Sequence, residues 1–236
     1  MQAIVLAGGL AKRMYPQTLT VPKAMLPVAG RPFVDWQLEL LVKSGVRDVV
    51  MCVAHLGEQI RDHVGDGSKL GARVRWSEEG PALLGTAGAI RAALPLLAET
   101  FLVTYGDSYL PFDYSGPIAL LDRSPDADGV MAVFKNEGKW DTSNVITDGD
   151  WIRRYEKGAG ATDPRFDHID YGATALRRSI VAALPEGKPG ALDAIQRDLA
   201  ARGRLRAYLA RERFYEVGSP PGLAELEALL KEKVTS

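Results

Sequence analysis

The chain has 236 residues, of which 46% are hydrophobic and 25% charged, an ordinary globular composition that argues against disorder. Its 29 lysines and arginines against 30 aspartates and glutamates give a net charge of −1, so it lacks the excess positive charge on which general nucleic-acid and membrane-surface binders depend. One cysteine, Cys52, excludes an intramolecular disulfide and a cysteine-cluster metal site.

Two further absences narrow the class of protein. His55, His63 and His168 show no H-E-x-x-H spacing, so we expect no zinc site. No apolar run approaches membrane-spanning length, and no basic region precedes the first apolar segment as in a secretory signal. We therefore expect a soluble, cytoplasmic protein with neither nucleic acid nor membrane as a partner.

The first half of the chain alternates strand and helix patterns. Short apolar runs closed by turn residues predict buried strands, and apolar residues at helical spacing predict the helices between them. In chain order, we predict strands at 3–7, 48–54, 72–76 and 101–105, and helices at 32–42, 57–64 and 85–97. This alternation predicts an α/β fold with a Rossmann-like, open, mostly parallel sheet and helices on both faces.

Beyond residue 114 the strands follow one another with turns between them, which predicts antiparallel or mixed strands added to the first half. We predict strands at 130–134, 144–146, 151–155, 170–176 and 205–209, a helix carrying Leu192, Ile195 and Leu199, and a terminal helix at 221–233. No long linker interrupts the chain. We expect a single domain, 1–236, with two lobes at about 1–113 and 114–236.

A glycine-rich loop follows the first strand. Gly8 and Gly9 allow backbone N–H groups to approach a phosphate, and Arg13 in the same loop can neutralise it. The loop matches neither G-x-G-x-x-G nor G-x-x-x-x-G-K-[ST], so dehydrogenase and P-loop hypotheses lose their main support. Taken alone, Gly8-Gly9 favours a plain tight turn, because short glycine motifs recur by chance.

The continuation of this loop adds a second motif, P-K-A-M-L-P-V-A-G-R-P over residues 22–32. Together the two motifs resemble the sugar-1-phosphate nucleotidylyltransferase (NDP-sugar pyrophosphorylase) family, whose pattern is L-A-[AG]-G-x-G-x-R-[LM] followed by P-K-x-[ML]-[LV]-P-V-x-x-[KR]-P. The branches most similar are the mannose- and heptose-1-phosphate guanylyltransferases and the muramate-1-phosphate uridylyltransferases.

Later segments resemble the family in the same order. They are the base and ribose loop at 78–88 ending L-G-T-A-G, Tyr-Gly-Asp at 105–107, Tyr-Glu-Lys at 155–157, the sugar-side strand at 168–172, and the late motif at 214–220. Three positions depart from the pattern: Ala11 replaces the third loop glycine, His168 replaces an asparagine, and Glu216 replaces the late metal-binding aspartate.

The resemblance implies attack of a sugar 1-phosphate oxygen on the α-phosphorus of a nucleoside triphosphate, with release of pyrophosphate. Because that nucleophile is already an anion, positioning and cations are the main requirements. The first lobe would bind the nucleotide and the second the sugar phosphate. The implied site residues are Arg13, Lys23 and Asp107 for catalysis; Leu6, Ala7, Gly8, Gly9, Arg13, Lys23, Glu79 and Gly85 for the nucleotide; Asn144, Glu156, Lys157 and Asp170 for the sugar phosphate; and Asp107 and Glu216 for Mg²⁺.

Several alternatives stay open at this point. The motifs favour GTP with a mannose- or heptose-type 1-phosphate over a UTP-dependent enzyme. A cytidylyltransferase for phosphocholine would need an ammonium cage, for which Tyr109, Trp140 and Tyr171 are candidates. A catalytically silent subunit that senses an NDP-sugar is the alternative from another class. The sequence leaves open whether the chain forms a homo-oligomer.

Overall fold

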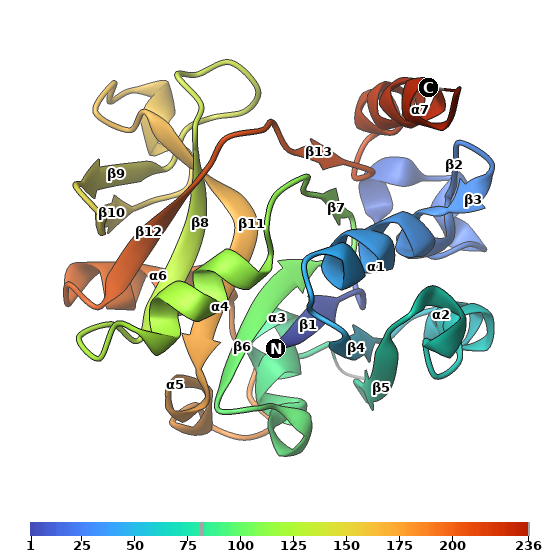
Figure 1. Cartoon of the computed structure of the whole chain (residues 1–236), viewed down its shortest axis with the longest axis horizontal. Helices are drawn as coiled ribbons and strands as arrows, with labels where there is room; N and C mark the ends of the chain where they lie inside the picture. The colour runs from blue at the N-terminus through green and yellow to red at the C-terminus, as the bar shows by residue number, and fades with distance from the viewer. Residues whose placement is uncertain (81–82, 236) are drawn as a thin grey trace.

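A mixed sheet of nine strands runs through the molecule in the order β5-β4-β1-β6-β11-β8-β12-β10-β9 (Figure 1). This computed structural model describes residues 1–80 and 83–235. The strands of the large sheet are β1 (Gln2–Leu6), β4 (Asp48–Val53), β5 (Arg73–Glu78), β6 (Thr100–Tyr105), β8 (Gly129–Lys135), β9 (Val145–Asp148), β10 (Trp151–Tyr155), β11 (His168–Arg177) and β12 (Leu205–Ala210). Two small sheets join β2 (Pro27–Val28) to β3 (Arg31–Pro32) and β7 (Ser108–Tyr109) to β13 (Tyr215–Glu216).

Strands β5, β4, β1 and β6 form a parallel half-sheet. The central residues of β1, β4 and β6 are apolar on both faces, and Ile4, Val50 and Leu102 are completely buried. A strand buried on both faces must be covered by helices on both sides, which is why these short apolar runs alternate with helices along the chain. The carboxyl ends of β1, β4 and β6 consequently meet at one edge of the sheet.

The second half of the sheet contains antiparallel strands, as the sequence predicts, but it is closed where an open sheet was expected. Strand β11 pairs antiparallel with both β6 and β8, and β9 pairs with β10 and also with β11 through Val145 and His168. The last five strands therefore close on themselves. A register shift in β11 between Asp170 and Thr174 accompanies this closure, because such irregularities bend a strand and increase its twist.

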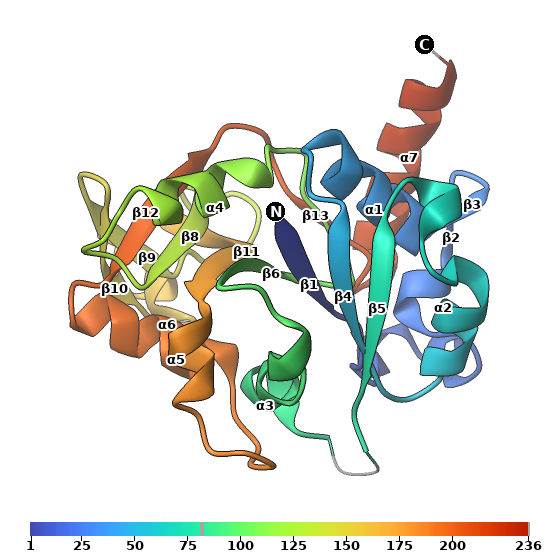
Figure 2. The same ribbon diagram turned by 60° about the horizontal axis from the view of Figure 1, so that its bottom comes forward.

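Helices cover both faces of the sheet, as the alternation predicts (Figure 2). The buried residues of α1 (Phe33–Lys43), α2 (Gly57–Val64) and α4 (Ser115–Asp122) pack into one apolar cluster against the sheet. Those of α3 (Gly85–Ala92), α5 (Arg178–Ala182) and α6 (Leu192–Ala201) pack into the other. Helix α7 (Pro220–Thr235) lies beside the small sheets and packs Leu226 and Leu230 against Val28 and Phe33.

Two elements differ from the sequence-based expectation in an informative way. The helix predicted at 85–97 ends at Ala92 and is followed by a 3₁₀ turn at Leu94–Leu96, because Pro95 cannot continue an α-helix. Helix α4 was not predicted, since Gly116 and Pro117 discourage a helix; both lie in its first turn, where a missing N–H costs nothing. None of the helices within the described ranges is both long and apolar enough to cross a membrane.

Candidate active site

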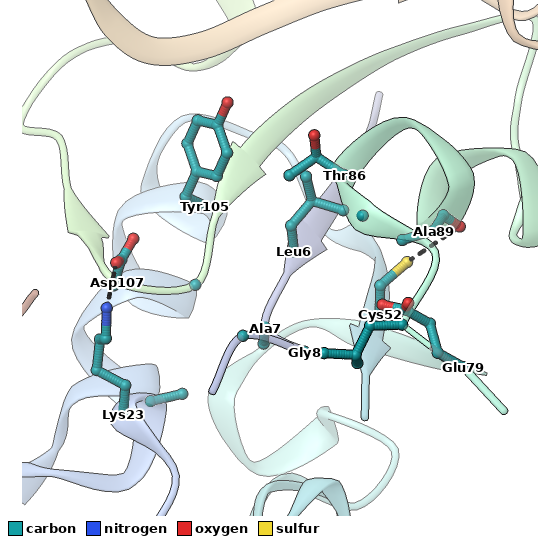
Figure 3. Close-up of a pocket in the computed structure, with 15 residues that line it drawn as sticks. Leu6, Ala7, Gly8, Lys23, Cys52, Glu79, Thr86, Ala89, Tyr105 and Asp107 are labelled. Atoms are coloured by element: carbon teal, nitrogen blue, oxygen red, sulfur yellow. Dashed lines mark hydrogen bonds and ion pairs between the residues drawn. The ribbon is translucent and has the colours of Figure 1, made fainter. Parts of the chain in front are cut away.

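A pocket of about 240 Å³ opens where β1, β4 and β6 end, the edge at which ligands bind in α/β sheets (Figure 3). It brings together the following residues singled out from the sequence: Leu6, Ala7, Gly8, Gly9, Lys23, Glu79, Gly85 and Asp107. It also includes residues that the sequence analysis assigned no role, namely Ala24, Cys52, Leu83, Thr86, Ala89, Tyr105 and Gly106.

The glycines in this pocket permit close approaches that a side chain would block. A Cβ atom on Gly8 would lie 2.9 Å from the Oε1 atom of Glu79 and 3.1 Å from the Cβ atom of Ala54. A Cβ atom on Gly106 would lie 2.8 Å from the Cβ atom of Ala7. The first loop therefore packs directly on its neighbours, and its backbone lines the pocket.

Glu79 is held at the end of the pocket away from Asp107 (Figure 3). Its Oε2 atom accepts a hydrogen bond of 2.8 Å from the backbone N–H of Leu84. The next residue, Gly85, has a φ of +68°. A Cβ atom there would lie 2.6 Å from the carbonyl oxygen of Gly190, so this position needs glycine on both counts. Pro81 and Ala82, which belong to the same motif, lie outside the described residues.

Lys23 and Asp107 form an ion pair in the wall of the pocket. The Nζ atom of Lys23, from the short 3₁₀ segment Lys23–Met25, lies 2.7 Å from the Oδ2 atom of Asp107, which follows β6. The two side chains are only 17% and 27% exposed. Partial shielding from water strengthens such a contact, and it places a cation and a carboxylate side by side.

Glu216 reaches the same region from the far end of the chain. Strand β13 pairs with β7 so that Glu216 lies opposite Ser108, and the N–H of Val217 donates a 2.9 Å hydrogen bond to the carbonyl oxygen of Asp107. An Nη atom of Arg13 lies 4.0 Å from the Oε2 atom of Glu216, and the Arg13 side chain is 69% exposed. The backbone at Glu216 and Val217 therefore lies next to the turn that carries Asp107, and Arg13 lies near the Glu216 carboxylate; neither Arg13 nor Glu216 lines the pocket itself.

This donor set fits a hard divalent cation such as Mg²⁺. Asp107 and Glu216 offer carboxylate oxygens, the ligands that Mg²⁺ prefers, and both are partly exposed. Within the described residues, no group of three or more His, Cys, Asp or Glu side chains is placed to hold a metal ion. A cation between these two carboxylates would thus take its remaining ligands from phosphate and water, which is usual for Mg²⁺ at phosphate sites.

The residues expected on the sugar-phosphate side form a separate group around Asp170. Its backbone N–H donates a 2.8 Å hydrogen bond to the side-chain oxygen of Asn144, and its own Oδ1 atom accepts one of 3.0 Å from the N–H of Gly172. The Tyr155 hydroxyl donates to the Oδ2 atom of Asp170 at 3.3 Å. Burial raises the pKa of Asp170, an effect that these hydrogen bonds and the charge of Lys157 oppose.

Glu156 and Lys157 are less constrained. Both side chains are exposed, and Glu156 accepts a 2.8 Å hydrogen bond from the guanidinium of Arg154. The backbone N–H of Glu156 donates to the carbonyl oxygen of Asn144, so Asn144 joins β10 and β11 at this point. None of Asn144, Glu156, Lys157 and Asp170 lines the pocket at Gly8 and Lys23, so the expected site falls into two parts.

Sequence analysis missed two polar neighbours of these groups. Gln196, on α6, donates to the Oδ2 atom of Asp170 at 3.4 Å and to the hydroxyl of Thr174 at 2.9 Å. Gln196 follows Ile195 in the chain, and the sequence pattern there shows only the apolar residues of one helix face. Tyr105 lines the pocket, and burial followed by the charge of Asp170 raises its pKa. Because Tyr105 belongs to the Tyr-Gly-Asp motif, the sequence could have indicated that it lies near the pocket.

Cys52 is buried, with 1% of its surface exposed. It also lines the pocket, with its thiol 3.9 Å from the carbonyl oxygen of Ala89. Burial raises its pKa to about 12, so it stays a neutral thiol near pH 7. A nucleophilic role for Cys52 is therefore excluded.

The three aromatic residues considered for an ammonium cage have other partners. Trp140 stacks on the guanidinium of Arg213, whose Cζ atom lies 3.7 Å from the ring centroid. Tyr109 packs against Tyr215, and Tyr171 lies in a cluster with Phe112, Phe134 and Phe214. A guanidinium of the chain itself thus occupies the face of Trp140 that a ligand cation would need.

Ala11, where the family pattern has glycine, adopts a left-handed conformation with a φ of +49°. Its carbonyl oxygen accepts hydrogen bonds of 2.9 Å from the N–H of Met14 and from the buried hydroxyl of Thr18. The backbone therefore keeps a conformation that favours glycine, although an alanine stands there.

Comparisons with known proteins agree with this geometry. A family model described as nucleotidyl transferase matches residues 2–140. An N-acetylmuramate alpha-1-phosphate uridylyltransferase from Caulobacter vibrioides is 30% identical over 241 aligned positions, which cover 98% of this chain and 97% of that protein. The protein of the same name from Neisseria meningitidis is 41% identical over 127 residues, covering 53% and 55%.

A mannose-1-phosphate guanylyltransferase from Mycobacterium tuberculosis is 32% identical over 192 residues, covering 79% of this chain and 51% of that protein. The chain thus spans about half the length of several curated relatives that it matches. Among solved structures, HddC from Yersinia pseudotuberculosis superposes with a TM-score of 0.80 at 24% identity, over 98% of this chain and 99% of that one, which shows a shared fold.

Proposed function

The chain belongs to the nucleotidyl transferase family, and from this premise we propose that it joins a nucleoside triphosphate to a sugar 1-phosphate, giving an NDP-sugar and pyrophosphate. The observation that carries the proposal is the Lys23–Asp107 ion pair, which lies in the wall of a pocket that the loop at Gly8 and Gly9 also lines. A cation and a carboxylate so placed suit a phosphate group and its metal ion.

In this proposal the triphosphate lies along Gly8 and Gly9, whose backbone can approach its oxygens closely. Lys23 binds near the α-phosphate, and the exposed Arg13 binds the β- and γ-phosphates and steadies pyrophosphate as it leaves. Asp107 and Glu216 hold Mg²⁺, which when bound acts as a Lewis acid toward the phosphate oxygens. The acceptor phosphate needs no general base, because it is already an anion.

Glu79 narrows the choice of base. A carboxylate accepts hydrogen bonds, and one oxygen of Glu79 already accepts from the backbone N–H of Leu84. Guanine, uracil and thymine each carry a ring N–H that can donate to a carboxylate, whereas cytosine and adenine present an exocyclic amine beside an acceptor nitrogen. We therefore propose a base with a ring N–H, and among these GTP or UTP as the donor, in line with relatives named guanylyltransferase and uridylyltransferase.

The acceptor side is proposed to lie in the second lobe, at Asp170 and Asn144, with Glu156 and Lys157 closing on the sugar hydroxyls and the phosphate. Asp170 supports this role because its carboxylate already accepts hydrogen bonds from the Tyr155 hydroxyl and the Gln196 amide in the second lobe. A carboxylate so placed can also accept a hydrogen bond from a sugar hydroxyl.

The test is a grid of pyrophosphate-release assays that crosses ATP, GTP, CTP, UTP and dTTP with a panel of sugar 1-phosphates and phosphocholine, with and without Mg²⁺. We expect release with GTP or UTP and a sugar 1-phosphate, and none without a divalent cation. Release with CTP and phosphocholine would replace the proposal with a cytidylyltransferase. Triphosphate binding without release from any pair would favour a sensing subunit.

A further inference from the structure

Helix α1 carries a glutamine in a position where the surrounding residues are apolar. Gln37 is completely buried, as are Phe33, Val34, Leu38 and Leu41 of the same helix. Burying a primary amide costs free energy unless its polar atoms find partners, and an apolar side chain would fill this space at no such cost. The presence of glutamine here therefore calls for a specific contact.

That contact is made with the turn that carries Asp107. The Nε2 atom of Gln37 donates hydrogen bonds to the carbonyl oxygens of Tyr105, at 2.7 Å, and Ser108, at 3.0 Å. Both N–H groups of the amide are used, and the two acceptors flank Gly106 and Asp107 on either side. The orientation of the amide is fixed by this environment, because the reversed one would point its oxygen at two carbonyl oxygens.

The other half of the amide has no structural use. The Oε1 atom of Gln37 is buried and has no hydrogen-bond partner in the described part of the chain. A buried acceptor without a hydrogen-bond partner lowers the stability of the fold. Gln37 therefore stabilises the fold less than a well-packed apolar side chain would. What it contributes is the pair of hydrogen bonds that its amide donates to the turn at 105–108.

The same turn also places the second proposed metal ligand. Ser108 begins β7, which pairs with β13 so that Ser108 lies opposite Glu216. The N–H of Val217 donates to the carbonyl oxygen of Asp107, between the two carbonyls that Gln37 holds. One amide therefore fixes the backbone that sets the separation of Asp107 and Glu216.

We propose that Gln37 is a positioning residue that clamps the turn at 105–108 and so holds Asp107 and Glu216 in place for the divalent cation. The effect of Gln37 on the divalent cation rests on the proposed function, because that function assigns the cation to Asp107 and Glu216. The clamp itself, however, is a property of the protein without nucleotide or metal, and it can be measured in that state.

The experiment compares Gln37→Met with Gln2→Met. Methionine keeps the length of glutamine and removes both donors and the orphaned oxygen. Gln2 is a matched control, because it is also buried and its Nε2 atom bonds Asp48 and the carbonyl oxygen of Leu96, away from the pocket. The readouts are amide hydrogen exchange of 105–109 in the free protein, the Mg²⁺ concentration for half-maximal turnover, and the Tm.

We expect Gln37→Met to accelerate exchange in 105–109 and to raise the half-saturating Mg²⁺ concentration about 10-fold, the usual effect of losing a residue that supports a metal ligand. Its Tm should change little, whereas Gln2→Met should lower the Tm and leave both other readouts unchanged. If Gln37→Met does not fold, Gln37→Asn provides the test, because its shorter amide cannot reach both carbonyl oxygens and should still accelerate exchange in 105–109.

Unchanged exchange in Gln37→Met would overturn the clamp, whatever reaction the protein catalyses. Faster exchange with an unchanged Mg²⁺ requirement in an active protein would overturn the positioning role. If the unmodified protein releases no pyrophosphate with any substrate pair, the proposed function fails instead. Half-saturation by Mg²⁺ would then be measured through its effect on triphosphate binding, with the same 10-fold shift expected.

Discussion

The two lobes of the molecule gather their site residues in different ways. In residues 1–113 the pocket is formed mainly by loops at the ends of parallel strands, where Gly8, Gly85 and Gly106 allow backbone to approach backbone. In residues 114–235 the candidate residues project from antiparallel strands of a closed ring, and Asn144 links Asp170 to Glu156. The pocket in the first lobe is thus lined largely by backbone, whereas the group around Asp170 in the second lobe is made of side chains.

The proposed function divides the two substrates along the same line. Backbone N–H groups suit the phosphates that every nucleoside triphosphate shares, whereas a side-chain network can change from one acceptor to another without altering the sheet. The ladder between β7 and β13 joins the two lobes, and it carries Asp107 and Glu216 at the boundary. Substitutions in the first lobe should therefore alter nucleotide binding, and substitutions in the second lobe should alter acceptor binding.

The largest effect is expected at the boundary. Asp107→Asn removes the charge that pairs with Lys23 and the oxygen proposed for the cation, and we expect a loss of about 10³-fold in turnover. Pyrophosphate release at saturating substrates and Mg²⁺ measures this. Asp198→Asn on α6, whose partner is Arg202 at the surface, should stay within about twofold. Retention of a tenth of the turnover by Asp107→Asn would refute the assignment.

A smaller effect, confined to the first lobe, is expected for Glu79→Gln. The variant keeps the shape of the side chain and loses a charged acceptor, so the KM for the nucleotide should rise about 30-fold. The KM for the sugar phosphate should not change. A rise in the acceptor KM instead would show that Glu79 does not face the base.

The reciprocal substitution in the second lobe is Asp170→Asn. Loss of a charged acceptor among Tyr155, Gln196 and Asn144 should raise the acceptor KM about 10-fold and leave nucleotide affinity unchanged. Calorimetric titration measures the affinity for the nucleotide, and steady-state kinetics measure the KM for the acceptor. Equal weakening of both ligands would mean that the lobes do not act independently.

Asp170 also predicts a pH dependence of stability. Because burial raises its pKa in the folded protein, the folded state binds more protons than the unfolded state from about pH 4 up to that raised pKa. This group therefore lowers the free energy of unfolding as the pH rises through that window. In urea unfolding from pH 4 to pH 7, the free energy of unfolding of Asp170→Asn should rise relative to that of the unmodified protein as the pH increases. A difference between the two proteins that stays constant with pH would contradict this prediction.

The smallest effect is expected at Ala11. Its φ of +49° costs an alanine more than a glycine, so Ala11→Gly should stabilise the fold by about 1 kcal/mol with turnover within twofold. Ala92→Gly, at the exposed end of α3, lacks a positive φ and should lose stability. Chemical denaturation compares the two, and destabilisation by Ala11→Gly would show that its conformation is not strained.

The difference between the lobes also explains what could be predicted from the sequence. The pocket residues of the first lobe lie in short contiguous motifs, so Gly8, Lys23, Glu79 and Asp107 were named before the structure and come together in it. The contribution of Gln196 depends on which face of α6 meets β11, and that of Gln37 on a turn 68 residues away. Neither contact leaves a local pattern.

The closed ring escaped prediction for a similar reason. Its closure rests on a single pairing between β9 and β11, at Val145 and His168, and on the irregularity in β11 near Asp170. Alternating patterns identify strands but do not say which edges meet. Helices α1 and α2, in contrast, follow from periodicity and appear close to their expected ranges, whereas α4 and α5 were not predicted.

The most direct test of the account is a crystal structure with a non-hydrolysable GTP or UTP analogue and Mn²⁺, located by its anomalous signal. We predict one metal peak bonded to carboxylate oxygens of Asp107 and Glu216 at about 2.1–2.2 Å and to phosphate oxygens. The triphosphate should lie along Gly8 and Gly9, with Lys23 released from Asp107 to the phosphates. Metal held elsewhere, or a nucleotide seated at Asp170, would contradict the division between the two lobes.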